Sequence, residues 1–284
     1  MSVFDGSRRS TVRGILRAGT FIVTAWDAFL LGIVQGATEF LPVSSSGHLV
    51  IVQSLLSVSV EGVAFEVIVH LGTLFSILLV YFSRITELTV GVLRNDRPSL
   101  SYAGLLFVAT IPAGVIGILA KEPIELLFDA PAVPGIALLV TGVVLWSSRS
   151  AIVRQSVTRP TLTAALLIGV AQACALIPGI SRSGATVVAA MWLGMEAREA
   201  AAFSFLMAVP VIAGATMLQI PDLVGPGQEG LSISLLVISG ITAGVTGVFA
   251  IRTFVGVLAR RSFHFFAPYC WTVGLLYLAY LFVN

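Results

Sequence analysis

Charged residues are scarce in this 284-residue chain: Asp, Glu, Lys and Arg make up 11% of it, against about 25% in a soluble domain. Hydrophobic residues make up 57% and the mean hydropathy is +1.01. This composition excludes an ordinary soluble domain and predicts an integral membrane protein made mostly of helices. The formal net charge of +2 is too small to indicate a nucleic-acid-binding protein.

Several chemical frameworks are also absent. The two cysteines, Cys174 and Cys270, lie in apolar stretches, which predicts small buried side chains rather than a disulfide or metal framework. No phosphate-binding P-loop or dinucleotide glycine motif is present. No set of three or four Cys, His and carboxylate residues has the spacing of a zinc site. Residues 1–24 form a basic N-terminal tail without a small-residue cleavage site of a signal peptide.

Six segments are long and apolar enough to cross a membrane, which takes about 20 residues. They are residues 63–83, 102–120, 131–147, 200–219, 231–251 and 264–283. Residues 25–56 and 161–196 behave differently, because each consists of two apolar arms around a break rich in Pro, Gly and Ser. An arm of about 15 residues is about 22 Å long as a helix and does not span alone. Each region is therefore predicted to be a re-entrant helical hairpin, buried in protein or lining a wet cavity.

The two hairpins are related in sequence. A shift of 137 positions aligns Gln35 with Gln172, Ser44 with Ser181, and Gly47 with Gly184. A chance match in a chain rich in Ser and Gly is the competing explanation, but the identities share one offset. We therefore predict an all-α polytopic membrane protein with an inverted-topology repeat, residues 25–150 and 161–284. Each half is a re-entrant helical hairpin plus three transmembrane helices, and the two breaks meet near the midplane.

The orientation follows from arginines in short loops, which mark the cytoplasmic side. Three predicted loops on one side of the membrane hold Arg84, Arg94, Arg97, Arg149, Arg154, Arg159, Arg252, Arg260 and Arg261. Loops with acidic residues alternate with them, including the loop with Glu122 and the loop with Glu229. Both termini are then outside. The four arginines of the N-terminal tail do not fit this orientation, and its topology is left open.

The first hairpin holds the polar residues that suit chemistry: Gln35, Glu39, Ser44, Ser45, Ser46 and His48. Gln35 and Glu39 share a helix face because they are four residues apart. Pro42 ends that helix. The serines either cap the next helix, as Ser often does, or bind an anion together with the amides at the helix start. A carboxylate in a membrane hairpin indicates function by default, which also favours a functional reading of His48.

The second hairpin offers Ser181, Arg182, Ser183 and Gly184. A guanidinium group fits phosphate oxygens. The alternative is an ion pair between Arg182 and Glu39, and both readings place Arg182 near the first cluster. Glu66 and His70, also four residues apart, either support this site or hydrogen-bond each other. A carboxylate, an imidazole, hydroxyls and a guanidinium match phosphoryl transfer. A transporter or lipid flippase is the alternative, because inverted repeats with broken helices are typical of transporters.

The quoted residues resemble a known family. "Gln35-x-x-x-Glu39" with "FLPVSSSGHL", "PGISRSGAT" and "FEVIVHLGTL" resemble signature regions of the undecaprenyl-diphosphate phosphatases, also called bacitracin-resistance proteins. The resemblance runs from about residue 25 to the C-terminus. The first acidic position of the family motif can be Glu or Gln, and here it is Gln35. This departure weakens any mechanism that needs two carboxylates there.

The resemblance implies a multi-pass enzyme of the bacterial cytoplasmic (inner) membrane with an outward-facing site. It implies removal of one phosphate from undecaprenyl diphosphate, which recycles the lipid carrier of cell-wall synthesis. The motif residues carried over are Glu39, Ser45, His48 and Arg182. It also implies dependence on a divalent cation. Because hard cations prefer oxygen ligands, we expect Mg²⁺ or Ca²⁺ to bridge Glu39 and the substrate diphosphate. Two mechanisms stay open: Ser45 attacks with His48 as its base, or His48 attacks while Glu39 orients it. The oligomeric state is also open, a homodimer included.

Overall fold

The structure of the chain is a computed structural model that describes residues 23–56, 58, 63–151, 156–223, 232–260 and 262–283. The described residues are helical apart from short connections and one isolated β-bridge between Val157 and Met195. Five of the helices are long and apolar enough to cross a membrane, or six if a bent pair counts as one span. Most of the basic tail, and also Arg154, Glu229 and Arg261, lie outside the described residues.

The two predicted hairpins are pairs of short helices. The first pair is α1 (Ala25–Phe40) and α2 (Ser45–Leu56), and the second is α8 (Leu162–Cys174) and α9 (Arg182–Trp192). The offset of 137 positions separates the first residues of α1 and α8, and also those of α2 and α9. The helix caps have the same offset, because Thr24 caps α1 and Thr161 caps α8 through the side-chain oxygen.

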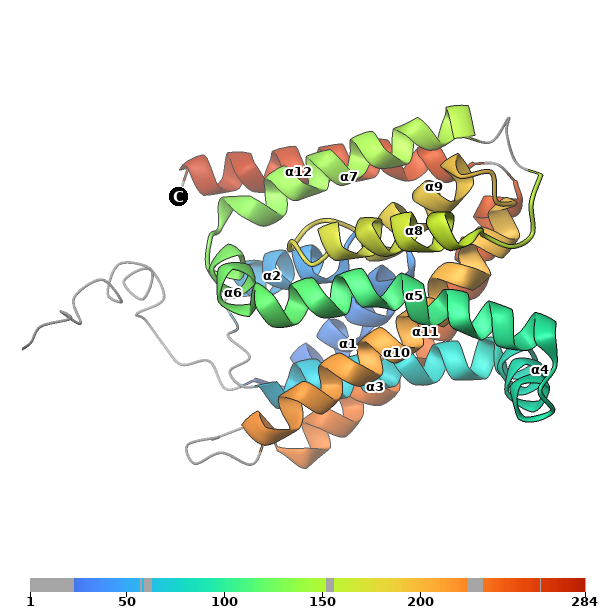
Figure 1. Cartoon of the computed structure of the whole chain (residues 1–284). Helices are drawn as coiled ribbons and strands as arrows, with labels where there is room; N and C mark the ends of the chain where they lie inside the picture. Colours follow the sequence, from blue (N-terminus) through green and yellow to red (C-terminus); the bar gives the residue numbers. More distant parts are fainter. Residues whose placement is uncertain are drawn as a thin grey trace, which may run out of the picture.

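Six long helices surround the hairpins (Figure 1). They are α3 (Val63–Val80), α5 (Arg97–Leu119), α7 (Ala132–Ala151), α10 (Ala197–Leu223), α11 (Ile233–Ala259) and α12 (Phe266–Val283). A single 3₁₀ turn, η3 (Phe263–Phe265), leads into α12. Each predicted span overlaps one of these helices. Figure 1 shows α7 and α12 along one side of the molecule and α3, α10 and α11 along the other, with the hairpin helices between them.

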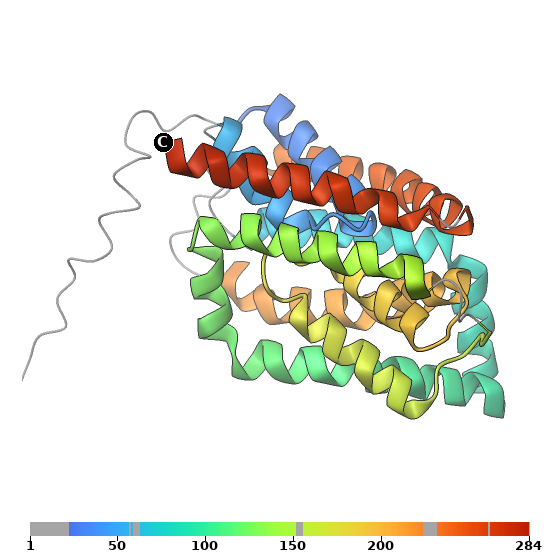
Figure 2. The same ribbon diagram turned by 90° about the horizontal axis from the view of Figure 1, so that it is seen from above.

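Three features differ from the sequence-based expectation. The span predicted at 63–83 ends early, because α3 stops at Val80 and the chain turns by 77° into α4 (Phe82–Leu93). Neither Gly nor Pro stands at this bend; Tyr81, at the bend, packs against Phe205 of α10. A short helix, α6 (Lys121–Phe128), connects α5 to α7 at one end of the molecule (Figure 2). Cys174, which we expected to be buried, is exposed at the end of α8, whereas Cys270 is buried.

Small residues allow the helix backbones to approach closely. A Cβ atom added at Gly32 of α1 would lie 2.6 Å from the Ser239 carbonyl oxygen of α11. An added Cβ atom would also clash with a carbonyl oxygen at two other glycines. At Gly72 of α3 the oxygen is that of Gly240 in α11, and at Gly169 of α8 it is that of Ala109 in α5. In lipid, apolar surface gives helices no net drive to associate, so close packing and interhelical hydrogen bonds hold them together.

The described arginines of the basic loops gather at one end of the molecule. Arg84 belongs to α4 and Arg94 follows its last residue, while Arg149 lies near the end of α7 and Arg252 near the end of α11. Figure 1 shows these helix ends on the same side. Apolar helices with positive charge at one end are the pattern of a multi-pass membrane protein.

We expect Gly32→Ala to lower the free energy of unfolding by about 1–3 kcal/mol, because the added methyl group overpacks the contact with α11. The matched control is Gly114→Ala in α5, where no atom lies within 4 Å of the added Cβ. That substitution should be neutral or stabilise by about 0.5–1 kcal/mol through helix propensity. Unfolding in detergent micelles measures both, and equal stability of the two variants would contradict the packing argument.

Candidate active site

The break in the first hairpin is set by Pro42 and Ser44. Helix α1 ends at Phe40, and Leu41 has an extended conformation, as expected for a residue before proline. Ser44 has φ of +70°, a left-handed conformation that is uncommon for a residue other than glycine. Its Oγ accepts a hydrogen bond from the Gly47 N–H at 3.4 Å and so caps the start of α2. Strained backbone of this kind occurs preferentially at functional sites.

The break in the second hairpin also ends in a serine cap, but a different residue of this break has the left-handed conformation. Ser181 caps α9 by accepting the Gly184 N–H at 3.1 Å, but its φ is −74°. The left-handed residue here is Gly179, with φ of +98°. Thr141 of α7 braces this loop: its hydroxyl donates to the Gly179 carbonyl at 2.9 Å and accepts the Ser181 N–H at 3.1 Å. In both hairpins two serine oxygens lie 3.3 Å apart, Ser44 with Ser46 and Ser181 with Ser183.

The two breaks touch each other. A Cβ atom added at Gly47 would lie 3.2 Å from the Cα of Gly179. Ser183 donates a hydrogen bond to the Leu41 carbonyl at 3.2 Å. The first turns of α2 and α9 therefore lie close together, and their free N–H groups provide positive partial charge for an anion.

Glu39 links the two hairpins. Its Oε1 accepts a hydrogen bond from Arg182 Nη2 at 2.6 Å, and its Oε2 accepts from Ser45 Oγ at 2.6 Å and Gln35 Nε2 at 3.1 Å. The exposed fraction is 6% for the Glu39 side chain and 15% for that of Arg182. The prediction that Arg182 lies beside the first cluster is therefore confirmed for Glu39 and Ser45. With the 137-residue offset, Ser45 and Arg182 occupy equivalent helix starts, and each binds one oxygen of the same carboxylate.

His48 faces a different neighbour. Its Nδ1 lies 2.8 Å from the Ser44 carbonyl oxygen. Because a carbonyl oxygen only accepts hydrogen bonds, Nδ1 carries the proton and donates it to this bond. In the neutral ring Nε2 therefore carries the lone pair, and it lies 2.9 Å from the hydroxyl of Tyr269 in α12. The two rings are stacked at 5.7 Å. Both ring nitrogens of His48 are thus occupied, and the Ser45 hydroxyl contacts Glu39 instead.

The sequence analysis missed two residues of this region, Tyr269 and Gln172. No polar motif surrounds Tyr269 in the sequence, so it looks like any other aromatic residue of an apolar helix. Gln172 is the counterpart of Gln35 at the 137-residue offset, and this alignment was its only signal. Its side chain is buried and has no hydrogen-bond partner among the described residues. The counterpart of Glu39 is Leu176, so Gln172 lacks the carboxylate that Gln35 contacts.

Glu66 and His70 do not pair through their side chains. His70 Nδ1 hydrogen-bonds the backbone carbonyl of Glu66 at 2.7 Å, while the Glu66 residue is exposed. His70 is close enough to Glu39 for an electrostatic interaction with its carboxylate. The two side chains therefore do not hydrogen-bond each other, and the proximity of His70 to Glu39 favours a supporting position for His70.

Polar atoms without partners remain beside the carboxylate. Gln35 Oε1 and Arg182 Nη1 are buried and have no hydrogen-bond partner in the described part of the chain. A buried guanidinium nitrogen without an acceptor fits an anionic ligand oxygen. No group of three or more His, Cys, Asp and Glu side chains that could hold a metal occurs within the described ranges. The arrangement can therefore bind an anion and present a hydroxyl held by a carboxylate.

Comparisons with known proteins agree on one family. A family model described as "Bacitracin resistance protein BacA" matches residues 28–276. The undecaprenyl-diphosphatase of Desulforapulum autotrophicum is 39% identical over 267 residues, covering 88% of this chain and 96% of the relative. The one of Alkaliphilus metalliredigens is 36% identical over 266 residues, covering 89% and 97%. Undecaprenyl-diphosphatase 1 of Bacillus cereus is 39% identical over 260 residues, covering 89% and 96%.

The buried ion pair generates a test that does not depend on activity. Arg182→Met should lower the free energy of unfolding by about 3–5 kcal/mol, because it leaves Glu39 charged, buried and without its cation. Adding Glu39→Gln to that variant should recover part of the loss. Arg94→Met, at an exposed arginine, is the control and should change little. Denaturant titration in mixed micelles measures all three, and an Arg182→Met protein as stable as wild type would overturn the assigned role of the pair.

Proposed function

The chain belongs to the bacitracin resistance protein BacA family, and we infer from this membership and from the polar cluster at Glu39 that it is a membrane undecaprenyl-diphosphatase. The reaction hydrolyses undecaprenyl diphosphate to undecaprenyl phosphate and inorganic phosphate, and returns the lipid carrier to cell-wall synthesis. The observation that carries this proposal is the contact of Glu39 with both Ser45 and Arg182 where two helix starts meet.

We propose that the diphosphate binds between the two helix starts. Arg182 Nη1 has no acceptor among the residues that the structure describes and is suited to a phosphate oxygen. The amides at the starts of α2 and α9, with the hydroxyls of Ser44, Ser46, Ser181 and Ser183 nearby, supply further donors. Gly47 and Gly184 allow the protein to pack closely around these helix starts, because an added Cβ atom would lie 3.2 Å from the Gly179 Cα and 3.2 Å from the Leu145 side chain, respectively. Donors already fixed in place stabilise the charge that develops on the transferred phosphoryl group.

The geometry favours Ser45 as the nucleophile with Glu39 as its proton acceptor. In this route the Ser45 oxygen attacks the terminal phosphorus, and the bond from phosphorus to the bridging oxygen breaks. The hydroxyl proton passes to Glu39 Oε2, which is 2.6 Å away, and the monophosphate lipid leaves. Water then hydrolyses the phosphoserine. Binding of the diphosphate to Arg182 would weaken its hold on Glu39 and make the carboxylate a stronger base.

The second route uses His48. Nδ1 is held by the Ser44 carbonyl, so Nε2 carries the lone pair that would attack phosphorus. This route requires Nε2 to leave the hydroxyl of Tyr269 first. Glu39 has no hydrogen bond to His48 in the structure and contacts Ser45 instead, which is why we favour the serine route.

A divalent cation fits this site only together with the substrate. One carboxylate, Glu39, and the unpartnered Gln35 Oε1 are oxygen donors of the kind that Mg²⁺ and Ca²⁺ prefer. These two oxygen donors are too few to form a complete metal site from the described residues alone. The diphosphate would therefore supply the other ligands. When bound, such a cation would neutralise charge on the phosphate oxygens.

We also propose the inverted-topology repeat, with hairpins 25–56 and 161–196 re-entrant from opposite sides and the catalytic site open to the outside of the bacterial inner membrane. The equal offset of helix starts and of threonine caps supports this proposal. The same architecture favours one alternative function, transport or flipping of an isoprenoid phosphate lipid. Transport needs no nucleophile, so phosphate release by the purified protein separates the two functions.

The re-entrant topology predicts which cysteines share a side. In a background without Cys174 and Cys270, Ala25→Cys and Ser54→Cys should both react with an impermeant thiol reagent from outside. Thr158→Cys and Leu193→Cys should react only from the cytoplasmic side. All four residues are exposed at the hairpin ends. Labelling of Ala25→Cys and Ser54→Cys from opposite sides would show that the first hairpin crosses the membrane.

The activity test is phosphate release from a long-chain isoprenyl diphosphate in detergent, with and without a chelator. Arg182→Lys should lose nearly as much activity as Arg182→Ala, because lysine keeps the charge but lacks the guanidinium fork. A lost charge-assisted hydrogen bond costs about 1.5–3 kcal/mol, which is about ten- to a hundredfold in rate. If chelation leaves the rate unchanged, the cation proposal fails.

Two further variants in this assay separate the nucleophiles. On the serine route Ser45→Ala should abolish turnover, whereas substantial residual turnover indicates attack by His48. On the histidine route His48→Gln should lower the rate more than Arg182→Lys does, since Gln keeps a similar size and polarity but cannot act as a nucleophile. On the serine route Glu39 accepts the proton, so His48→Gln should lower the rate less than Ser45→Ala does. Full activity of His48→Gln would exclude any chemical role for the imidazole.

A further inference from the structure

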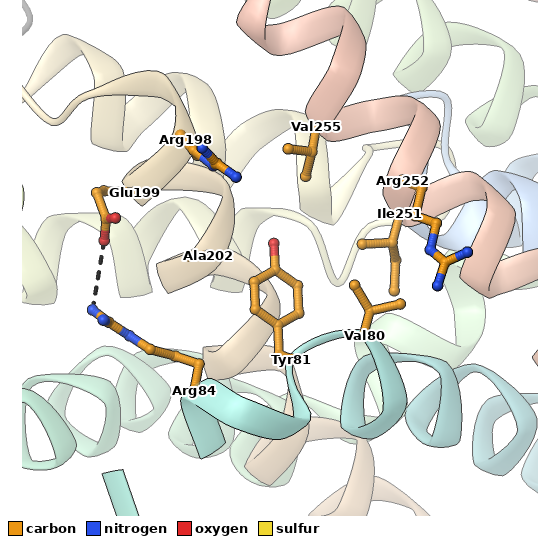
Figure 3. A pocket seen from close by; sticks show the side chains of 9 residues that line it. All are labelled: Val80, Tyr81, Arg84, Arg198, Glu199, Ala202, Ile251, Arg252 and Val255. Atoms are coloured by element: carbon orange, nitrogen blue, oxygen red, sulfur yellow. Dashed lines mark ion pairs between the residues drawn. The ribbon is translucent and has the colours of Figure 1, made fainter. Parts of the chain in front are cut away.

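A cavity lined in part by arginines lies away from the hairpins, where the end of α3 and the start of α4 meet α10 and α11. Its volume is about 370 Å³, and the residues that line it include Tyr81, Arg84, Arg198 and Arg252. We call it the basic cavity (Figure 3). None of its lining residues belongs to α1, α2, α8 or α9. It is therefore separate from the site at Glu39.

The bend between α3 and α4 builds one wall of this cavity. The 77° turn at Tyr81 directs the tyrosine ring and Arg84 toward the start of α10 and the end of α11. Figure 3 shows the Tyr81 hydroxyl pointing into the space between Arg198 and Val255. Arg84 is held in position by Glu199, at 3.7 Å, and its guanidinium lies 5.4 Å from the centre of the Tyr102 ring.

The charges of the basic cavity do not balance. Three arginines face one carboxylate, Glu199, which pairs with Arg84. Arg198 and Arg252 have no carboxylate at ion-pair distance in the described part of the chain. The cavity therefore carries an excess of two positive charges. A phosphate monoester carries about −1.5 to −2 at pH 7, which matches this excess.

The remaining walls are apolar and lie at a membrane boundary. Val80, Ile251 and Val255 line the cavity beside the arginines. The cavity is at the end of the molecule where the other described basic residues gather. The positive-inside rule predicts that this end lies at the headgroup level of the bilayer. Aliphatic walls beside guanidinium groups suit a lipid headgroup together with the first part of its chains.

We propose that the basic cavity binds a phosphate monoester anion, the headgroup of a lipid in the leaflet at that end of the protein. Arg198 and Arg252 bind the phosphate oxygens through their guanidinium forks, and the Tyr81 hydroxyl donates a further hydrogen bond. Free inorganic phosphate shares this chemistry and is the other source of the anion. The proposal does not depend on the diphosphatase activity, so either can fail without the other.

The test uses the full chain in phosphatidylcholine nanodiscs that contain a small fraction of a photoactivatable phosphatidic acid. After illumination, mass spectrometry locates the labelled peptides, and residues 80–90, 197–207 and 248–258 report on the basic cavity. Peptides of the hairpins report separately on the site at Glu39. A photoactivatable phosphatidylcholine shows the labelling due to apolar contact alone. The variant R198Q/R252Q removes the unpaired cations, and R94Q/R97Q removes the same charge from exposed positions at the same end.

We expect phosphatidic acid to label the cavity peptides more than phosphatidylcholine does. R198Q/R252Q should reduce this labelling about tenfold, as expected for lost charge-assisted hydrogen bonds, and R94Q/R97Q should stay near the wild-type level. Equal labelling by the two probes, or unchanged labelling in R198Q/R252Q, would overturn the proposal. Added inorganic phosphate identifies the source: suppression of the labelling assigns the site to free phosphate, and persistence assigns it to the lipid.

Discussion

The ion pair between Glu39 and Arg182 is the interaction around which the two halves of the chain are arranged. A lone charge at membrane depth is unfavourable, so each of these groups requires the other, or a ligand, close to it. The carboxylate is bound by Arg182 from one hairpin and by Ser45 and Gln35 from the other. It therefore fixes the distance between two helix starts that are 137 positions apart in sequence.

This contact is possible only because the backbones around it approach closely. Gly47 and Gly179 leave room for the two breaks to touch. The Thr141 hydroxyl, from α7, fixes the second break through its hydrogen bonds to Gly179 and Ser181. Further out, glycines of α1, α3 and α8 allow the same closeness between whole helices. Since lipid favours neither separation nor association of apolar surfaces, these close contacts hold the scaffold in place around the polar cluster.

The two polar regions of the molecule use their arginines differently. Arg182 is largely buried and pairs with Glu39 through Nη2, so a ligand binds to Nη1 beside a carboxylate that already holds the guanidinium group. Arg198 and Arg252 are exposed and have no carboxylate partner among the described residues. The first arrangement suits selective recognition of a diphosphate before reaction, and the second suits reversible binding of an anion.

The sequence alone predicted the class of protein, the two pairs of short apolar arms within 25–56 and 161–196, and the proximity of Arg182 to Glu39 and Ser45. Polar residues, Pro and Gly stand out in an apolar chain, so local chemistry marks both breaks. The 77° bend at Tyr81, the exposure of Cys174 and the contact between His48 and Tyr269 were decided only by the tertiary structure. In a soluble helix the apolar stripe shows which face is buried. A membrane helix is apolar on its lipid face and on its protein face, so its sequence does not show which remote side chains will meet.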